Sequence, residues 1–422
     1  MDIQESGRCP FRLDPAGTNI HAEADQLRER GPATRVELPG GVVVWSINSH
    51  SGVQQVLKDS RVTKNARADW PAFINNEIPA DWELISWITM DNMATATGQN
   101  QVRLRRLVGK AFSPKRIDAI RPRIAEIVDG LIEQLAEVPE GEIIDLRDQF
   151  CYRLPAALMA DMLGMSEESR AKTAQVMNMM VNTTVSPEQA QALLIGWQQA
   201  ISDLIELKSQ DPGEDITSDL ILARDDENSR LTEAELLGTL FAILGAGTST
   251  TVDFLGKLLV ELLTHRDQLD RLLAGELSWD DAIEEGLRVE GPVAHLPLRY
   301  ATEDIDIDGV IIPRGDAILV NYAGVGRDPE IHGDTAGEFD VDREDKTHLA
   351  FGAGPHYCLG WAIAREEVKI GLSALFTKFP DLRLAVDRAD LQAQPTFIMN
   401  GYSSLPVQLT SAAFGTNEVA AA

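Results

Sequence analysis

The fold of this chain is decided by one stretch, Phe351-Gly352-Ala353-Gly354-Pro355-His356-Tyr357-Cys358-Leu359-Gly360. Glycines on both sides of the cysteine allow the backbone to turn sharply and to lie close against a flat ligand. Helix-forming residues follow from Trp361, so we expect Cys358 at the positive end of a helix dipole. Such a position favours a thiolate over a thiol, and a thiolate is the form that binds metals.

This decapeptide resembles the haem-binding loop of the cytochrome P450 family, whose pattern is Phe-Gly-x-Gly-x-His/Arg-x-Cys-x-Gly. The resemblance implies that Cys358 binds the iron of haem b, and that His356 contacts a haem propionate. Phe351, Gly352 and Gly360 would complete the cofactor loop. Taken without the resemblance, Cys358 is also compatible with a buried structural thiol or a protease nucleophile.

Composition narrows the class of protein. The 422 residues are 44% hydrophobic and 25% charged, and the formal charge of −28 argues against nucleic acid as a partner. The three cysteines, Cys9, Cys151 and Cys358, are far apart and form no disulfide framework, which favours a reducing, cytoplasmic setting. No signal peptide or membrane span is predicted.

Helical periodicity dominates the sequence, and a hairpin pattern surrounds Pro39-Gly40-Gly41. The resemblance extends over nearly the whole chain and implies the P450 fold, mainly α with a small β-rich region. We expect one P450 domain over residues 1–410 and a disordered tail over 411–422.

A basic segment runs from Arg103 to Arg123, with Asp118 as its only acidic residue. Its members are Arg103, Arg105, Arg106, Lys110, Lys115, Arg116, Arg121 and Arg123. A charge run of this kind is often a solvated helix face. The resemblance favours a second interpretation, a docking surface for an acidic [2Fe-2S] or similar ferredoxin that a ferredoxin reductase supplies with electrons. Gln101 and Arg105 resemble the family's His-x-x-x-Arg clamp, so both are predicted to contact a haem propionate.

Aromatic side chains are concentrated between residues 70 and 93, where prolines interrupt any regular element. They either anchor a surface loop or line the substrate pocket that the family builds from this region. Methionines within 177–184 are either core residues or part of a substrate lid. The predicted substrate contacts are Trp70, Phe73, Trp82, Trp87, Val293, Ala294, Leu296, Phe397 and Ile398.

A capping box at Thr232 and Glu235 opens a predicted helix that continues to about His265. Glycines and hydroxylated residues in its middle, 244–251, are costly in a helix, so they predict either a local opening or two shorter helices. The segment resembles the family's oxygen-binding groove. The resemblance implies that Ala246 and Gly247 form the groove and that Thr250 assists oxygen activation.

Ser249 departs from the family pattern, in which a carboxylate usually precedes the threonine. Serine has no accessible acid form and cannot serve as an ordinary general acid. Asp253 could replace the missing carboxylate only through ordered water. Ser249 therefore puts the usual route of proton delivery in doubt.

Further motifs occur in the family's order. Glu285-x-x-Arg288 and the meander residue Arg343 are predicted to form a structural Glu–Arg–Arg cluster, and Arg299 is predicted to bind a propionate. The leading function is a haem-thiolate monooxygenase that uses O₂ and electrons from NAD(P)H to oxidise a small molecule, in natural-product biosynthesis. One alternative is oxidative C–C or C–N coupling of an aromatic substrate, such as a tryptophan-containing cyclic dipeptide, without oxygen insertion. A more remote one is a non-catalytic haem-binding protein.

Overall fold

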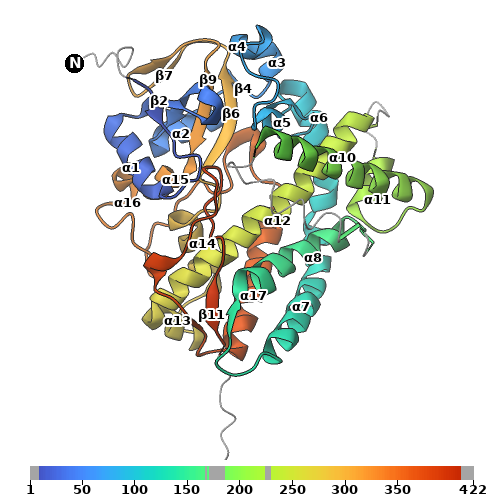
Figure 1. The fold of residues 1–422 in the computed structure, drawn as a ribbon, viewed down its shortest axis with the longest axis vertical. Coiled ribbons are helices and arrows are strands. Elements are labelled where there is room, and N and C mark those ends of the chain that lie inside the picture. Colours follow the sequence, from blue (N-terminus) through green and yellow to red (C-terminus); the bar gives the residue numbers. More distant parts are fainter. Residues whose placement is uncertain (1–8, 167–168, 171–185, 224–229, 410–422) are drawn as a thin grey trace, which may run out of the picture.

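The computed structural model describes residues 9–166, 169–170, 186–223 and 230–409. The predictions made for 177–184 and for the tail at 411–422 fall outside these residues. The main sheet lies at one end of the molecule, a smaller one lies among the helices at the opposite end, and helices fill the rest (Figure 1). The expected mainly α architecture with a small β-rich region is confirmed.

The β-rich region is a six-stranded sheet with the order β1-β2-β3-β9-β6-β4. Its strands are β1 (Phe11–Arg12), β2 (Ala33–Glu37), β3 (Val43–Ile47), β9 (Ala317–Asn321), β6 (His295–Ala301) and β4 (Val62–Thr63). Strands β2 and β3 form the predicted antiparallel hairpin, with Ala33 opposite Ile47 and Glu37 opposite Val43. Gly40, at the turn, adopts a φ of 80°, a conformation that glycine tolerates better than other residues.

Smaller sheets complete the β structure. One has the order β10 (Arg383–Leu384), β11 (Pro406–Gln408) and β5 (Ile143–Asp145), and the other pairs β7 (Ile305–Ile307) with β8 (Val310–Ile312). Strand β6 matters most for the site, because it pairs with both β9 and β4 and so joins distant parts of the chain.

The longer helices are arranged around a central one, α12 (Glu233–Thr264). They are α1 (Ile20–Arg30), α2 (His50–Lys58), α6 (Gly98–Gly109), α7 (Pro114–Ala136), α8 (Arg153–Met162), α10 (Pro187–Gln210), α11 (Ile216–Leu222), α13 (Arg266–Leu273), α14 (Trp279–Val289) and α17 (Trp361–Lys378). Short helices lie between them at α3 (Ala66–Asp69), α4 (Pro71–Ile74), α5 (Ile85–Thr89), α15 (Tyr322–Val325) and α16 (Pro329–His332).

Helix α12 crosses the molecule diagonally in Figure 1 and packs against α8, α10, α14 and α17. The predicted capping box is present: the Thr232 hydroxyl accepts from the Glu235 amide at 3.1 Å, and the Glu235 carboxylate accepts from the Thr232 amide at 2.9 Å. Within the described residues, α12 is the one helix long and apolar enough to cross a membrane, but 56% of its apolar window is buried inside the protein. It is therefore placed as the core helix of the fold.

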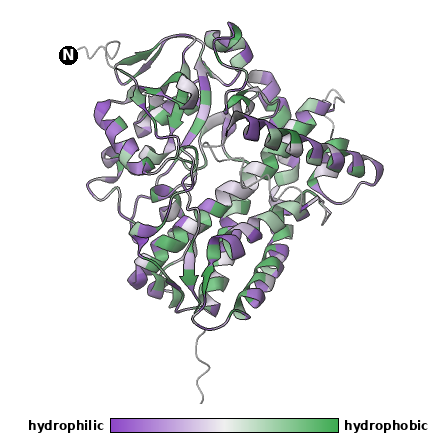
Figure 2. Cartoon of the chain, in the orientation of Figure 1, coloured by the Kyte–Doolittle hydropathy of each residue, from purple (hydrophilic) through white to green (hydrophobic). Residues whose placement is uncertain are grey.

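Hydropathy follows this arrangement. The outlying α1 is largely hydrophilic in Figure 2, whereas the interior helices carry the hydrophobic residues. The largest apolar cluster joins α7, α8, α12, α14 and α17, and a second one lies under the six-stranded sheet. Burial of these faces supplies the main driving force for folding.

Candidate active site

The cysteine loop turns as the sequence predicts. The Cys358 amide donates to the Phe351 carbonyl at 2.9 Å, which closes the loop just before α17. Gly352 and Gly354 adopt φ values of 71° and 68°. A Cβ on Gly354 would lie 2.5 Å from the Leu57 carbonyl oxygen at the end of α2. A side chain at this position would therefore push the loop away from its support.

The sulfur of Cys358 lies at the start of α17, next to the backbone amides of Gly360 and Trp361. Burial raises the pKa of the Cys358 thiol, while these amides and the charges of Arg105 and Arg365 act in the opposite direction. Amides and a helix N-terminus around a half-buried sulfur suit a thiolate that ligates a metal cation.

Phe351, the first residue of this loop, is held in place by charged neighbours. The Arg365 guanidinium lies 4.5 Å from the Phe351 ring centre, and Arg365 forms an ion pair with Glu284. Burial raises the pKa of Glu284, but hydrogen bonds from His348 and Arg365 outweigh it and lower the pKa to about 2. Glu284 is therefore ionised near neutral pH and fixes the position of the stacked arginine.

Helix α12 presents an accessible stripe at the centre of the protein. Ala246 is exposed and Ala242, Ser249 and Thr250 are half-buried, although the adjacent Leu244, Thr248 and Thr251 are buried. This side of α12 is therefore not fully covered by other protein side chains. The Thr250 hydroxyl donates to the Ala246 carbonyl at 2.6 Å. The helix continues through 244–251, so the expected opening does not interrupt it, and the alternative of two shorter helices is wrong.

The glycines of this segment also have packing roles that the sequence did not reveal. A Cβ on Gly247 would lie 2.5 Å from the sulfur of Met159 in α8, and one on Gly245 would lie 3.4 Å from the Trp197 indole in α10. Gly247 thus allows α12 to approach α8 closely, whereas a side chain at Gly245 would make only an ordinary contact with Trp197.

Asp253 is directed to other partners. It is buried, lies 3.8 Å from Arg147, and has the Gln394 amide at 2.9 Å and 3.2 Å from its carboxylate oxygens. Burial raises the pKa of Asp253 to about 7, with Arg147 opposing the shift. These contacts correct the suggestion that Asp253 might replace the carboxylate missing at Ser249.

Basic side chains converge between the cysteine loop, α6 and the sheet. The basic cluster comprises Lys64, Arg105, Arg299 and His356. Burial lowers the pKa of His356 to about 3, and the charges of Lys64, Arg299 and Arg105 act in the same direction. Burial also lowers the pKa of Arg299, whose guanidinium is hydrogen-bonded to the Tyr322 hydroxyl. No ion pair joins the cluster to an acidic side chain among the described residues.

A ligand that brings carboxylates satisfies this cluster, and the two propionates of haem b are such groups. The residues present therefore fit the predicted cofactor. The sequence analysis predicted Arg299, Arg105 and His356 but missed Lys64 and Tyr322. Gln101 uses one amide N–H to donate to the Pro355 carbonyl at 2.6 Å, so it ties α6 to the cysteine loop, and its propionate contact stays a prediction.

Several predicted substrate contacts lie in the core instead. Trp82 is 2% exposed and donates its indole N–H to the Pro39 carbonyl at 2.8 Å. Trp70 is stacked on Tyr300 with ring centres 5.3 Å apart. Ala294 packs with Ile20, Ala24 and Ala323 between α1 and α15. In the structure the side chains of Trp70, Trp82 and Ala294 thus anchor the β-rich region, and their contact with a substrate stays a prediction.

The remaining residues predicted to contact the substrate are either fully buried or partly exposed. Phe397 and Ile398 are fully buried in the cluster beneath the sheet, and Phe73, Trp87 and Val293 pack against that cluster from its edge. Leu296 is the one half-buried residue of the otherwise buried β6, as expected for a side chain that faces a cavity. Contact of these residues with a substrate remains a prediction.

The positive charge of the basic segment at 103–123 is more neutralised than the sequence suggests, because several of its arginines pair with acidic residues, some in α7 itself and others in distant elements. The ion pairs are Arg103–Glu235, Arg116–Asp219, Arg121–Asp118, Arg121–Glu366, Arg123–Glu126 and Arg123–Asp161. A partner that docks here would meet a mixed surface with a smaller positive excess than expected.

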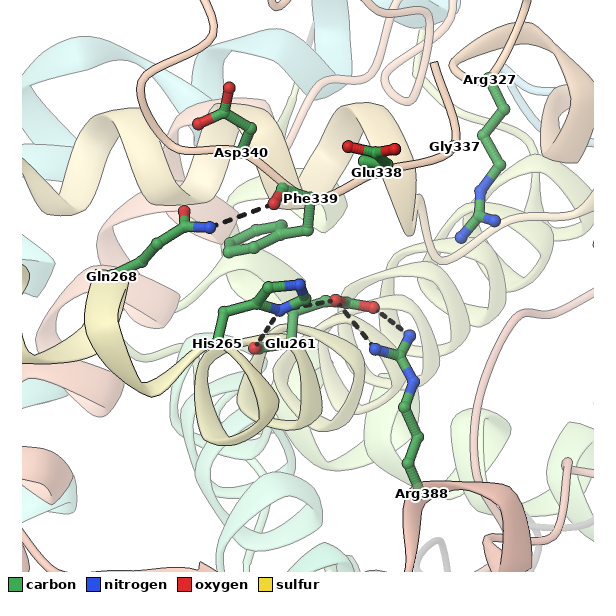
Figure 3. Close-up of a pocket in the computed structure, with 9 residues that line it drawn as sticks. All are labelled: Glu261, His265, Gln268, Arg327, Gly337, Glu338, Phe339, Asp340 and Arg388. Atoms are coloured by element: carbon green, nitrogen blue, oxygen red, sulfur yellow. Dashed lines mark hydrogen bonds and ion pairs between the residues drawn. The ribbon is translucent and has the colours of Figure 1, made fainter. Parts of the chain in front are cut away.

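A separate hollow of about 520 Å³ lies at the carboxyl end of α12 (Figure 3). Arg388 forms an ion pair with Glu261 across it, and Gln268 donates to the Phe339 carbonyl at 3.2 Å. None of its lining residues belongs to the predicted cofactor or substrate sites. The first contact connects the end of α12 to the segment after β10, and the second connects α13 to the loop before the cysteine motif.

Comparison with known proteins points to one family. Residues 279–400 match the family model described as Cytochrome P450. The chain is 48% identical, over 95% of its length and 98% of the relative's, to 2-hydroxy-5-methyl-1-naphthoate 7-hydroxylase of Streptomyces carzinostaticus.

Solved structures give the same result. The crystal structure of CYP154A1 from Streptomyces coelicolor A3(2) is 44% identical with a TM-score of 0.90, covering 95% of this chain and 100% of that one. CxnD, a P450 enzyme for C–S bond formation in chuangxinmycin biosynthesis, is 29% identical with a TM-score of 0.84, covering 96% of this chain and 99% of that one.

Proposed function

Because this chain belongs to the cytochrome P450 family, we propose that it hydroxylates a small, largely apolar molecule in natural-product biosynthesis, in the cytoplasm. Electrons from NAD(P)H would arrive through a ferredoxin reductase and a ferredoxin that docks near Arg103–Arg123. Two observations carry the proposal: the Cys358 sulfur at the start of α17 and the accessible stripe on α12, two helices that pack together.

The roles of the residues follow from their positions. Cys358 would hold the haem iron, and the basic cluster would hold the propionates. When bound, the haem supplies the redox chemistry that activates O₂. Ala246 would leave space for a ligand beside the cofactor because its side chain is only a methyl group, and Leu296 would provide an apolar wall for the substrate.

Thr250 is the proposed residue for proton delivery. Its hydroxyl donates to the Ala246 carbonyl, so the oxygen of Thr250 is free to accept a hydrogen bond from a water molecule and hold it in position; the proton delivered would be that of the water. Ser249 lies beside it on the accessible stripe and offers a second hydroxyl, without the acidity of a carboxylate.

Replacement of Thr250 by alanine is expected to lower the fraction of NADH electrons recovered in product by about tenfold or more, since positioned proton transfer contributes on this scale or above it. Product formed per NADH consumed is the measurement. Thr264→Ala is a matched control, because Thr264 donates to the Val260 carbonyl at 2.8 Å in the same geometry at the end of α12. If Thr250→Ala and the wild type formed the same amount of product per NADH consumed, Thr250 would have no part in proton delivery.

Oxidative coupling without oxygen insertion is the second candidate. The accessible stripe carries Ser249 where members of the family usually have a carboxylate. CxnD, a P450 with the same fold, is described as an enzyme for C–S bond formation. Hydroxylation and coupling differ in the fate of oxygen, because only hydroxylation leaves an atom of O₂ in the product.

The test begins with an optical titration of the ferric protein against hydroxynaphthoates, macrolactones, steroids and tryptophan-containing cyclic dipeptides. We expect a saturable shift of the Soret band with an aromatic acid, given the naphthoate hydroxylase relative. Turnover of the best ligand under oxygen-18 gas should then add one labelled atom to the product. An unlabelled, coupled product would replace the hydroxylase proposal by the second candidate.

A further inference from the structure

Lys64 is a buried lysine in an unusual position. Its side chain is 8% exposed, and it directly follows β4. Val62 and Thr63 lie opposite Ala301 and Tyr300 in the antiparallel pair of β4 with β6, so the next residue, Lys64, lies opposite Arg299. Directly opposed residues of an antiparallel pair project to the same face.

This register places two buried cations side by side. Like charges directly opposite each other destabilise a sheet, and an isolated buried ammonium is more costly still. Arg299 is 4% exposed and has the Tyr322 hydroxyl as its partner. No ion pair or hydrogen bond connects the Lys64 ammonium to another described residue.

The rest of the surroundings add positive charge. His356 and Arg105 complete the basic cluster, and burial together with the charge of Arg299 lowers the pKa of Lys64 to about 7. A sequence that keeps a lysine here accepts a large desolvation cost. An anion that enters the cluster removes that cost, because it pairs with several of these groups at once.

We propose that Lys64 binds a carboxylate within this cluster, and that this carboxylate is a haem propionate. The inference rests on the proposed function, because it requires that the protein bind haem. The propionate is favoured because Arg299 and His356 adjoin both Lys64 and the Cys358 loop. A carboxylate of the substrate has the same chemistry and is the other possible source.

The test compares Lys64→Met with wild type in two measurements. The first is the rate of haem transfer to apomyoglobin, together with the midpoint potential of the iron. We expect haem loss to accelerate about tenfold, as for a lost charge-assisted hydrogen bond, and the potential to become more negative because a positive charge is removed. The second is the Soret titration with 1-naphthoic acid and its carboxamide.

Lys58→Met is the matched control, since Lys58 is an exposed lysine at the end of α2. Lys64→Arg keeps the charge and should restore the wild-type rate and potential, which a purely structural role of Lys64 would not predict. Faster haem loss with an unchanged preference for acid over amide supports the propionate. Unchanged haem retention with loss of that preference assigns Lys64 to a substrate carboxylate.

If Lys64→Met changes neither measurement, Lys64 binds no carboxylate and the inference is wrong. That outcome is separate from the proposed function, which would fail if the wild-type protein itself took up no haem.

Discussion

Replacement of Cys358 by serine is expected to reduce product formation by on the order of 10³-fold or more, because the Cys358 thiolate would hold the haem iron and supply the electron density that its oxygen chemistry needs. The variant should still fold. The loop is closed by the backbone amide of residue 358 and the Phe351 carbonyl, and serine keeps that hydrogen bond. Serine is also smaller than cysteine and creates no clash. The loss should therefore be chemical, with little change in the free energy of unfolding.

The absorption band of the ferrous carbonyl complex separates these effects. In Cys358→Ser the thiolate-dependent band should disappear while the far-ultraviolet circular dichroism stays unchanged. Cys9→Ser is the control, because Cys9 is exposed and distant in sequence from the loop. Cys151 is fully buried, and burial raises the pKa of its thiol to about 12, so it is a poor alternative ligand. Retention of the thiolate band in Cys358→Ser would show that another residue binds the iron.

The cysteine loop could be predicted because its information is local. The roles of Gly352, Gly354 and Cys358 depend on backbone conformation and on the helix that follows, and adjacent residues determine both. The capping box at Thr232 and the hairpin around Gly40 are local in the same sense. Patterns of this kind do not depend on where the rest of the chain lies.

Contacts between distant segments could not be predicted. Lys64 acquires its significance only from the pairing of β4 with β6, which places it opposite Arg299. Trp82 is a residue type that often lines pockets, but in the structure its indole N–H donates a hydrogen bond to the Pro39 carbonyl. Gly247 was assigned to the groove, and only the structure shows how closely Met159 approaches it. In each case tertiary packing decides among roles that the residue type alone leaves open.

The Glu–Arg–Arg cluster was predicted from motifs and is confirmed as a buried network. Arg288 and Glu285 have fully buried side chains and are joined by two hydrogen bonds of 2.7 Å. Arg288 also donates to the carbonyls of Gly326, Ala336 and Glu338 at 2.7, 2.6 and 2.7 Å. Arg343 approaches Glu285 at 3.3 Å. One guanidinium thus holds α14 to the chain segments that lead to the cysteine loop.

Replacement of Arg288 by alanine is therefore expected to destabilise the protein by about 3–5 kcal/mol, because it leaves the Glu285 carboxylate buried without its main partner. Natural proteins of this kind have only about 5–15 kcal/mol of stability, so little haem-loaded protein should accumulate. Urea unfolding and haem content per polypeptide are the measurements. Arg288→Lys should fail as well, since an ammonium cannot reproduce a fork that bonds a carboxylate and three carbonyls at once.

Arg271 offers the matched control. It pairs with Asp342 through two nitrogens in the same meander, but its side chain is 40% exposed and that of Asp342 is 53% exposed. Exposed pairs contribute about 0–1 kcal/mol, so Arg271→Ala should retain both stability and haem. If Arg288→Ala unfolds at the same urea concentration as Arg271→Ala, burial does not set the strength of this network. The Glu–Arg–Arg cluster would then have to be explained by contact with the cofactor loop, and haem affinity would change while the free energy of unfolding did not.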